Sequence, residues 1–248
     1  MRERLLSSVD EGAALSSLRG RGLNYDPAGA PLDGRPDGHW HVDGSDIVIG
    51  REAAGAPAAG GPWELACALV AQYEFTDRRI VRAIYRPADD LLGRDMLLEG
   101  RFAWLRFYLG VRVTGVTDET RDGARGTERA WGWSYQTLQG HLEQGRLSYE
   151  VIKNLASGRV MFRVSGYSRP APMRSPVIRL GFALFGRRAQ RRFYRSVQLR
   201  LRALVQAGQQ GTPLPRPAVR ADGIATAPAG AAPEPLDRLA RGILHPGR

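Results

Sequence analysis

The middle of the chain alternates between apolar runs and short turn signals, and this pattern constrains the fold more than any other feature. In several runs every second residue is apolar or aromatic, as in Trp131, Trp133 and Tyr135, which is typical of a strand with one buried face. Parallel neighbours would need long crossovers, so the short turns predict an antiparallel sheet of about six strands. The predicted strands are 80–85, 96–108, 111–117, 130–138, 146–152 and 160–167, with Gly110 separating the second from the third.

After Pro176 the apolar residues recur with the period of a helix instead. The pattern predicts one long helix over 177–207 that packs on the sheet, and therefore an α+β fold. Arg200 falls near the centre of the apolar stripe, where a straight helix would have to give its charge a carboxylate partner or an anionic ligand group. The stripe consists of Ile178, Phe182, Phe185, Ala189, Phe193, Val197 and Leu204.

The rest of the chain is less regular. We expect an N-terminal extension over 1–22, one α+β domain over 23–207, and a disordered tail rich in Pro, Ala and Gly over 208–248. Within the domain, residues 24–62 are interpreted as an irregular lead-in. A short buried helix is predicted from Trp63 to Gln72.

Composition bounds the class of protein. The chain of 248 residues is long enough for a core without disulfides, and its single cysteine, Cys67, cannot form an internal one. No signal-peptide pattern is visible, and no apolar run approaches the roughly 20 residues of a membrane-spanning helix. These features favour a cytoplasmic protein that does not span a membrane.

The net charge of +11 is concentrated in the predicted helix. Between Arg169 and Ala207 there are ten arginines and no acidic residue. A solvated outer face is the first interpretation, and an anionic membrane surface or an acidic protein is the second. Nucleic acid ranks last, because among the aromatic residues only Tyr194 comes near the exposed face. The arginines opposite the stripe are Arg187, Arg188, Arg191, Arg195 and Arg202.

The loop from Tyr135 to Gly145 is the first candidate for chemistry. His141 and Glu143 would form an acid–base pair if both faced a pocket. The alternative, which we favour, is that Thr137 and Glu143 tie down a wide turn while His141 caps backbone groups. Nothing in the neighbouring sequence supplies a nucleophile or a third orienting group.

A second histidine pair, His39 and His41, has the spacing that would place both rings on one side of a strand. Two histidines without a further ligand do not define a metal site, so we predict none, and no cofactor. Signatures of phosphate-binding loops, dinucleotide-binding folds, serine hydrolases and zinc proteases are absent from the sequence.

The same loop, together with the later Tyr167-Ser168-Arg169-Pro170, resembles the bacterial and plant family called domain of unknown function nineteen-ninety. That family has a Tyr-Gly-Thr-Leu-x-Gly-His-x-Glu-x-Gly loop, then a strand pair ending in Ser-Arg-Pro, then a final helix rich in Arg and Gln. Here Gln136 stands where the family has Gly. The resemblance covers roughly 23–207 and implies no known reaction. By analogy it implies a helix-grip fold, as in lipid-transfer and polyketide-cyclase-like proteins, in which a curved sheet wraps around the C-terminal helix.

These observations lead to a first hypothesis, a module that binds a small hydrophobic or amphipathic molecule between sheet and helix. The second is an enzyme that uses the same cavity, with His141 as base and Glu143 orienting it. The third is a scaffold that docks an anionic surface through the arginine-rich helix. The predicted ligand-binding residues are Trp133, Tyr135, Thr137, His141, Ser168, Arg169 and Arg200.

Overall fold

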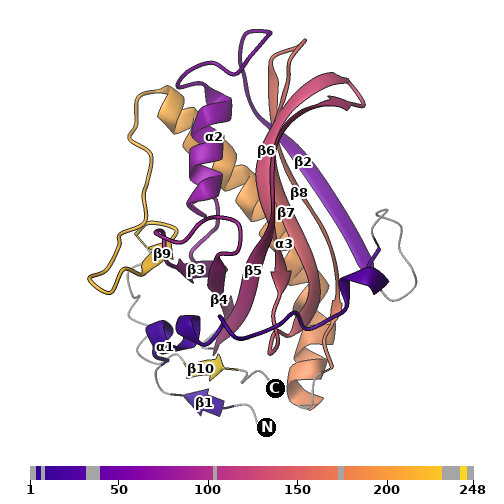
Figure 1. The fold of residues 1–248 in the computed structure, drawn as a ribbon, viewed down its shortest axis with the longest axis vertical. Helices are drawn as coiled ribbons and strands as arrows, with labels where there is room; N and C mark the ends of the chain where they lie inside the picture. The colour runs from indigo at the N-terminus through magenta and orange to yellow at the C-terminus, as the bar shows by residue number, and fades with distance from the viewer. Residues whose placement is uncertain are drawn as a thin grey trace.

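A computed structural model describes residues 4–6, 9–31, 40–102, 105–172, 176–230 and 241–244, for which side chains are described except at 4–6, 102, 105, 176–191 and 241–244. Its centre is a large, curved antiparallel sheet crossed by one long helix, as the strand and helix periods predicted (Figure 1). Helix α3 runs from Pro176 to Gln209 and crosses the sheet diagonally, in contact with β2. The shorter α2, Pro62–Ala71, packs beside α3 and also contacts β2, β6 and β7.

The main sheet has the order β2-β8-β7-β6-β5-β4-β3-β9, and every neighbouring pair in it is antiparallel. Two short strands extend it, because β10 pairs in parallel with β5 and β1 pairs with β10. The strands are β1 Arg4–Leu6, β2 His41–Arg51, β3 Val81–Tyr85, β4 Asp95–Phe102, β5 Leu105–Gly123, β6 Gly126–Thr137, β7 Glu143–Asn154, β8 Arg159–Pro170, β9 Ala225–Ala227 and β10 Arg241–Leu244.

The prediction of about six strands was too low. Strand β2 lies in the segment predicted to be an irregular lead-in. It was not predicted because Asp43, Gly44 and Asp46 have low strand propensity. It nevertheless pairs with β8 along most of its length. Strand β9 lies in the segment predicted to be a disordered tail, yet it pairs with β3 and its neighbour Ile224 is buried.

The predicted turn at Gly110 was also wrong, because β5 is continuous from Leu105 to Gly123. A Cβ atom at Gly110 would lie 2.5 Å from Cδ2 of Leu18, so a larger residue would displace this leucine side chain, and the glycine marks close packing and not a turn. Leu18 follows α1, Glu11–Ser16, which covers β3 and β4. The N-terminal segment is therefore part of the packing at this end of the sheet.

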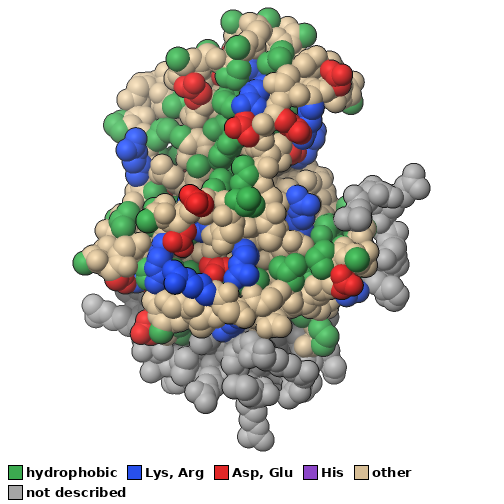
Figure 2. Space-filling view, viewed as in Figure 1, with side chains coloured by type: hydrophobic (Ala, Val, Ile, Leu, Met, Phe, Trp, Pro, Cys, Tyr) green, Lys and Arg blue, Asp and Glu red, His purple; other side chains and the backbone are tan. Residues whose placement is uncertain are grey.

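The main core lies between the inner face of the sheet, defined here as the face toward α3, and the two helices α2 and α3. From α3 the buried core residues are Tyr194, Val197, Leu201 and Val205. A polar contact joins the layers where Gln198 Nε2 donates to Ser45 Oγ of β2 at 3.1 Å. In the face seen in Figure 2, basic and acidic side chains lie together near β3 and β4. No helix among the described residues is long and apolar enough to cross a membrane.

Candidate functional site

The loop between β6 and β7 is held by Asn24 from the N-terminal part of the chain. Thr137 Oγ1 donates to Asn24 Oδ1 at 2.7 Å and accepts the Gly145 N–H at 3.0 Å. Asn24 Nδ2 donates to the Glu143 carbonyl oxygen at 2.8 Å. Gly140 takes a positive φ of 90°, which the turn requires and glycine tolerates. Thr137 therefore ties down the turn through Asn24 and Gly145, and Glu143 takes part through its backbone rather than its carboxylate.

His141 is buried in this loop, and its ring faces the backbone of Glu143. Nδ1 accepts the Glu143 N–H at 2.9 Å and also lies 3.0 Å from the Glu143 carbonyl oxygen. The contact that would let a carboxylate orient a general base is therefore made with a peptide group instead. In this geometry His141 caps a backbone group of the turn. Its role as a general base stays a prediction.

An aromatic cluster stands beside the loop. Trp40 packs edge-on against Tyr25 and Tyr167, with ring centroids at 5.4 and 5.3 Å. The Arg169 guanidinium lies over the Trp40 ring at 4.2 Å, and its Nε donates to Gln144 Oε1 at 2.7 Å. Gln136, where the family has glycine, donates to Tyr25 Oη at 2.8 Å. Arg169 is thereby engaged at the edge of the sheet and does not reach the main core.

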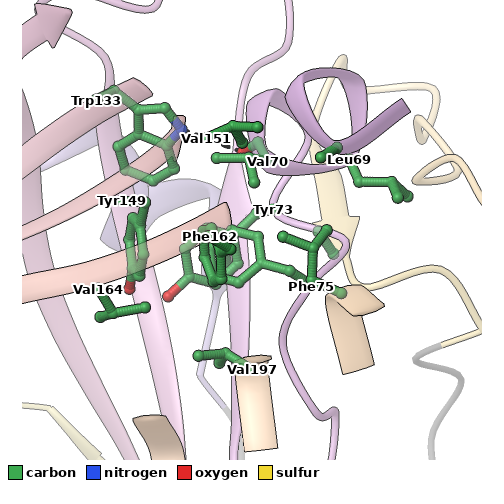
Figure 3. Packing of buried hydrophobic residues seen from close by; sticks show 14 of the residues in the cluster. Leu69, Val70, Tyr73, Phe75, Trp133, Tyr149, Val151, Phe162, Val164 and Val197 are labelled. Carbon is green, nitrogen blue, oxygen red and sulfur yellow. Dashed lines mark hydrogen bonds between the residues drawn. The ribbon is translucent and has the colours of Figure 1, made fainter. Parts of the chain in front are cut away.

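The inner face of the sheet carries a second, larger aromatic layer (Figure 3). Trp133 of β6 and Tyr149 of β7 lie with centroids 5.1 Å apart, and Tyr135 lies 6.1 Å from Tyr149. Phe162 of β8 stacks on Tyr149 at 6.4 Å. Val197 closes the layer from α3, and Val70, whose carbonyl oxygen accepts the Trp133 indole N–H at 3.1 Å, closes it from α2. Trp133 and Tyr135 are thus brought together as predicted.

Tyr73, which the sequence analysis did not single out, completes this layer from the end of α2. The Tyr73 N–H donates to the Val70 carbonyl oxygen, and the Glu74 N–H donates to the Leu69 carbonyl oxygen. These two hydrogen bonds form the Schellman motif that ends α2. Tyr73 stands at the position where this motif favours glycine, with a φ of 61°. A side chain in the left-handed region costs about 1 kcal/mol, so the ring is held there against a local preference.

The hydroxyl groups of Tyr73 and Tyr149 meet inside this apolar layer, as Figure 3 shows. Both oxygens are buried and neither makes a hydrogen bond of good geometry with a described residue, although the Tyr149 hydroxyl lies close enough to those of Tyr73 and Tyr135 for weak hydrogen-bond interactions. They do lie close enough for each to affect the pKa of the other. Burial raises the pKa of both phenols, so both stay protonated.

Arg200 does not enter the aromatic layer. Its Nε donates to the Glu74 carbonyl oxygen at 3.0 Å, and the Glu74 carboxylate adds an attractive charge. The carboxylate in turn accepts the Ala229 N–H at 2.8 Å, which fixes the segment after β9. Arg200 is therefore held by the Glu74 peptide oxygen, while the Glu74 carboxylate attracts it without a direct ion pair, and burial raises the pKa of that carboxyl group.

The remaining predicted positions are dispersed. Arg195 and Arg202 are exposed, whereas Tyr194, considered above for the exposed face, is buried. Ser168 pairs with His41 and Gly145 in the sheet, next to the loop. The side chains of Arg187, Arg188, Arg191 and Phe182, and residue His39, lie outside the described part of the chain. In the part of the chain with placed side chains, no group of His, Cys, Asp and Glu is arranged to hold a metal ion.

An open, curved antiparallel sheet crossed by a long C-terminal helix defines the helix-grip class of α+β proteins. Residues 24–200 match the model of the family described as domain of unknown function DUF1990, and the chain belongs to this family. The match confirms the resemblance seen in the loop and in the Ser-Arg-Pro sequence. No curated protein matches the sequence.

Among solved structures, the chain is similar to Ara h 8.0201, with 11% identity and a TM-score of 0.39 over 68% of this chain and 99% of that one. It is also similar to a point mutant of norcoclaurine synthase from Thalictrum flavumn, solved with a transition-state analogue. There the identity is 10% and the TM-score 0.43, over 68% of this chain and 96% of that one. With scores this low, neither likeness supports a ligand or a reaction for this chain.

Proposed function

We propose that the protein binds a small hydrophobic or amphipathic molecule between the inner face of the sheet and α3. The observation that carries this proposal is the pair of buried hydroxyls on Tyr73 and Tyr149. A buried polar group without a partner costs about 1–3 kcal/mol, and phenylalanine would fill the same space without that cost. The two hydroxyls face one another but are poorly satisfied, and a bound molecule that hydrogen-bonds to them would explain why both are tyrosines.

The backbone at Tyr73 supports the same conclusion. Glycine would relieve the positive φ and phenylalanine would remove the buried hydroxyl, yet a tyrosine stands there. Unfavourable local features of this kind gather at functional sites. The surrounding rings of Trp133, Tyr135 and Phe162 offer an apolar surface for the body of a ligand, with the hydroxyls fixing its orientation.

Native mass spectrometry of freshly purified protein is the first test, with extraction of any bound compound after unfolding. We expect a stoichiometric apolar passenger. Titration with N-phenyl-1-naphthylamine, a neutral apolar fluorophore, gives a second readout, in which wild-type protein should show saturable binding.

The double variant Tyr73→Phe/Tyr149→Phe should lose at least about ten-fold in affinity for the passenger, because roughly 1.4 kcal/mol of hydrogen bonding disappears. Tyr85→Phe is the matched control, since Tyr85 is equally buried but donates to the Gln72 carbonyl oxygen at 2.9 Å. Absence of any passenger together with no binding of the fluorophore would contradict the proposal.

A further inference from the structure

Glu143 stands at the end of the inner face. In β7, residues 143, 145, 147, 149 and 151 share one side of the strand, and the pairing with β8 runs without a bulge from Glu143 to Lys153. Glu143 therefore lies on the same side as Tyr149 and Val151 of the aromatic layer. Its charge also contributes to the raised pKa of Tyr135, after the larger effect of burial, which places the carboxylate near that ring.

Glu143 is half-buried, and its carboxylate has no hydrogen bond or ion pair with any described residue, although its backbone is firmly held. The N–H is bonded to His141 Nδ1 and the carbonyl oxygen accepts from Asn24. These contacts fix the strand end, so the side chain stays directed to the inner face. Burial raises the pKa of this carboxyl group from 4.5 to about 7, and among the described side chains no cation lowers it.

The titratable groups around Glu143 do not supply the missing partner. His141 faces its backbone, and Tyr135 of β6 stays a neutral phenol because its pKa is raised by burial. On β8, Arg169 is occupied by Trp40 and Gln144. The side chains of 176–191 on α3 lie outside the described part of the chain.

We propose that Glu143 binds the protonated amine of an amphipathic ligand whose apolar, preferably aromatic, body lies against Tyr135 and Tyr149. This inference rests on the proposed function and narrows its ligand class. A buried carboxylate is stabilised by a cation in contact with it, and charge-assisted hydrogen bonds are about twice as strong as neutral ones. Aromatic faces add attraction for the ammonium group. Fatty acids and other anions are disfavoured at this position, despite the net charge of +11 of the whole chain.

Calorimetric titration with two isosteric probes tests this inference. We expect 2-(naphthalen-2-yl)ethylamine to bind at least about ten-fold more tightly than 2-(naphthalen-2-yl)ethanol at pH 8. In Glu143→Gln the two affinities should become equal. Glu150→Gln is the matched control, because Glu150 lies on the other side of β7 and pairs with Arg121 at 3.1 Å. This variant should keep the preference for the amine.

A measurement that needs no variant repeats the test. For wild-type protein the preference for the amine should shrink between pH 8 and pH 6, because Glu143 becomes protonated across its pKa of about 7 while the amine stays charged. Equal affinities at pH 8, or a preference that survives Glu143→Gln, would overturn the inference.

The failure of this inference is distinguishable from that of the proposed function. If neither naphthyl compound binds but N-phenyl-1-naphthylamine does, the amine proposal is overturned and the apolar site stands. If the neutral fluorophore and the extraction also give nothing, the proposed function itself is wrong.

Discussion

The environments of two carboxylates at opposite ends of strand β7 differ: one is buried and paired, and the other is half-buried. Near its C-terminal end, Lys153 Nζ donates to Glu52 Oε2 at 2.7 Å, and both side chains are almost fully buried. The same carboxylate accepts the N–H groups of Trp63 and Ala58 at 2.7 and 3.0 Å. At the N-terminal end, Glu143 has none of these partners among the described residues.

The pKa values of Glu52 and Glu143 are shifted in opposite directions by these different surroundings. Burial alone would raise the pKa of Glu52, but the hydrogen bonds from Lys153 and two peptide groups lower it overall. For Glu143, burial raises the pKa to about 7, and no other described group shifts it. Polar groups needed only for the fold are satisfied within it, so the Glu52–Lys153 pair is structural, whereas Glu143 has no structural partner among the described residues.

The largest effect on the free energy of unfolding is expected from breaking the Glu52–Lys153 ion pair. Lys153→Met removes the cation and leaves the Glu52 carboxylate buried, which should lower the free energy of unfolding by about 3–5 kcal/mol. Urea denaturation followed by tryptophan fluorescence measures this loss. The double variant Glu52→Gln/Lys153→Met should recover part of this loss. A loss below about 1 kcal/mol for Lys153→Met would contradict the prediction, because it is the value expected of a solvent-exposed ion pair.

A substitution of Glu143 should have an intermediate effect on the free energy of unfolding, and this effect should be stabilising. Between pH 4.5 and about 7 the folded state holds a proton on Glu143 that the unfolded state has released. The free energy of unfolding therefore falls as pH rises through this window. Glu143→Gln should abolish this fall and be more stable than wild type at pH 8 by roughly 1–3 kcal/mol. Urea denaturation at pH 5 and pH 8 measures both, and a less stable variant at pH 8 would reveal a structural partner for Glu143.

The smallest effect distinguishes tyrosines that bond within the fold from those that do not. Tyr73→Phe should leave the stability of the ligand-free protein unchanged or raise it by up to about 1 kcal/mol, because it removes an unsatisfied hydroxyl. Tyr85→Phe should lower stability by about 1 kcal/mol, because Tyr85 donates to the Gln72 carbonyl oxygen. Thermal melts of both variants measure the contrast, and equal losses would mean that Tyr73 has a partner in the folded protein.

The sheet and the long helix could be predicted because their signal is local. Alternation in Trp131, Trp133 and Tyr135 and the helical period after Pro176 each lie within one element. Strand β2 was missed because its aspartates and glycines hide the pattern, and its pairing with β8 depends on residues far along the chain. Short strand β9 carries only Ala-Thr-Ala, which has no periodic signal.

The candidate site was predictable only in part. Tyr135 and Trp133 follow from the strand pattern, and His141 and Glu143 from the loop motif. Tyr73 could not be found, because nothing in Gln72-Tyr73-Glu74 signals a left-handed residue where glycine is usual. Nor does the sequence tell Glu52 from Glu143, since Glu52 is satisfied by a lysine 101 residues away.

Strand β9 has a practical consequence for anyone who expresses a shortened protein. The family match ends at residue 200, and a fragment cut there or shortly after α3 would lose Ala225–Ala227. Strand β3 would then become an exposed edge strand, and its unpaired peptide groups could pair with a second molecule. Such a fragment would also lose Ile224 from the packing under α1 and the peptide that Glu74 holds. A trimmed domain should therefore precipitate where the full chain stays in solution.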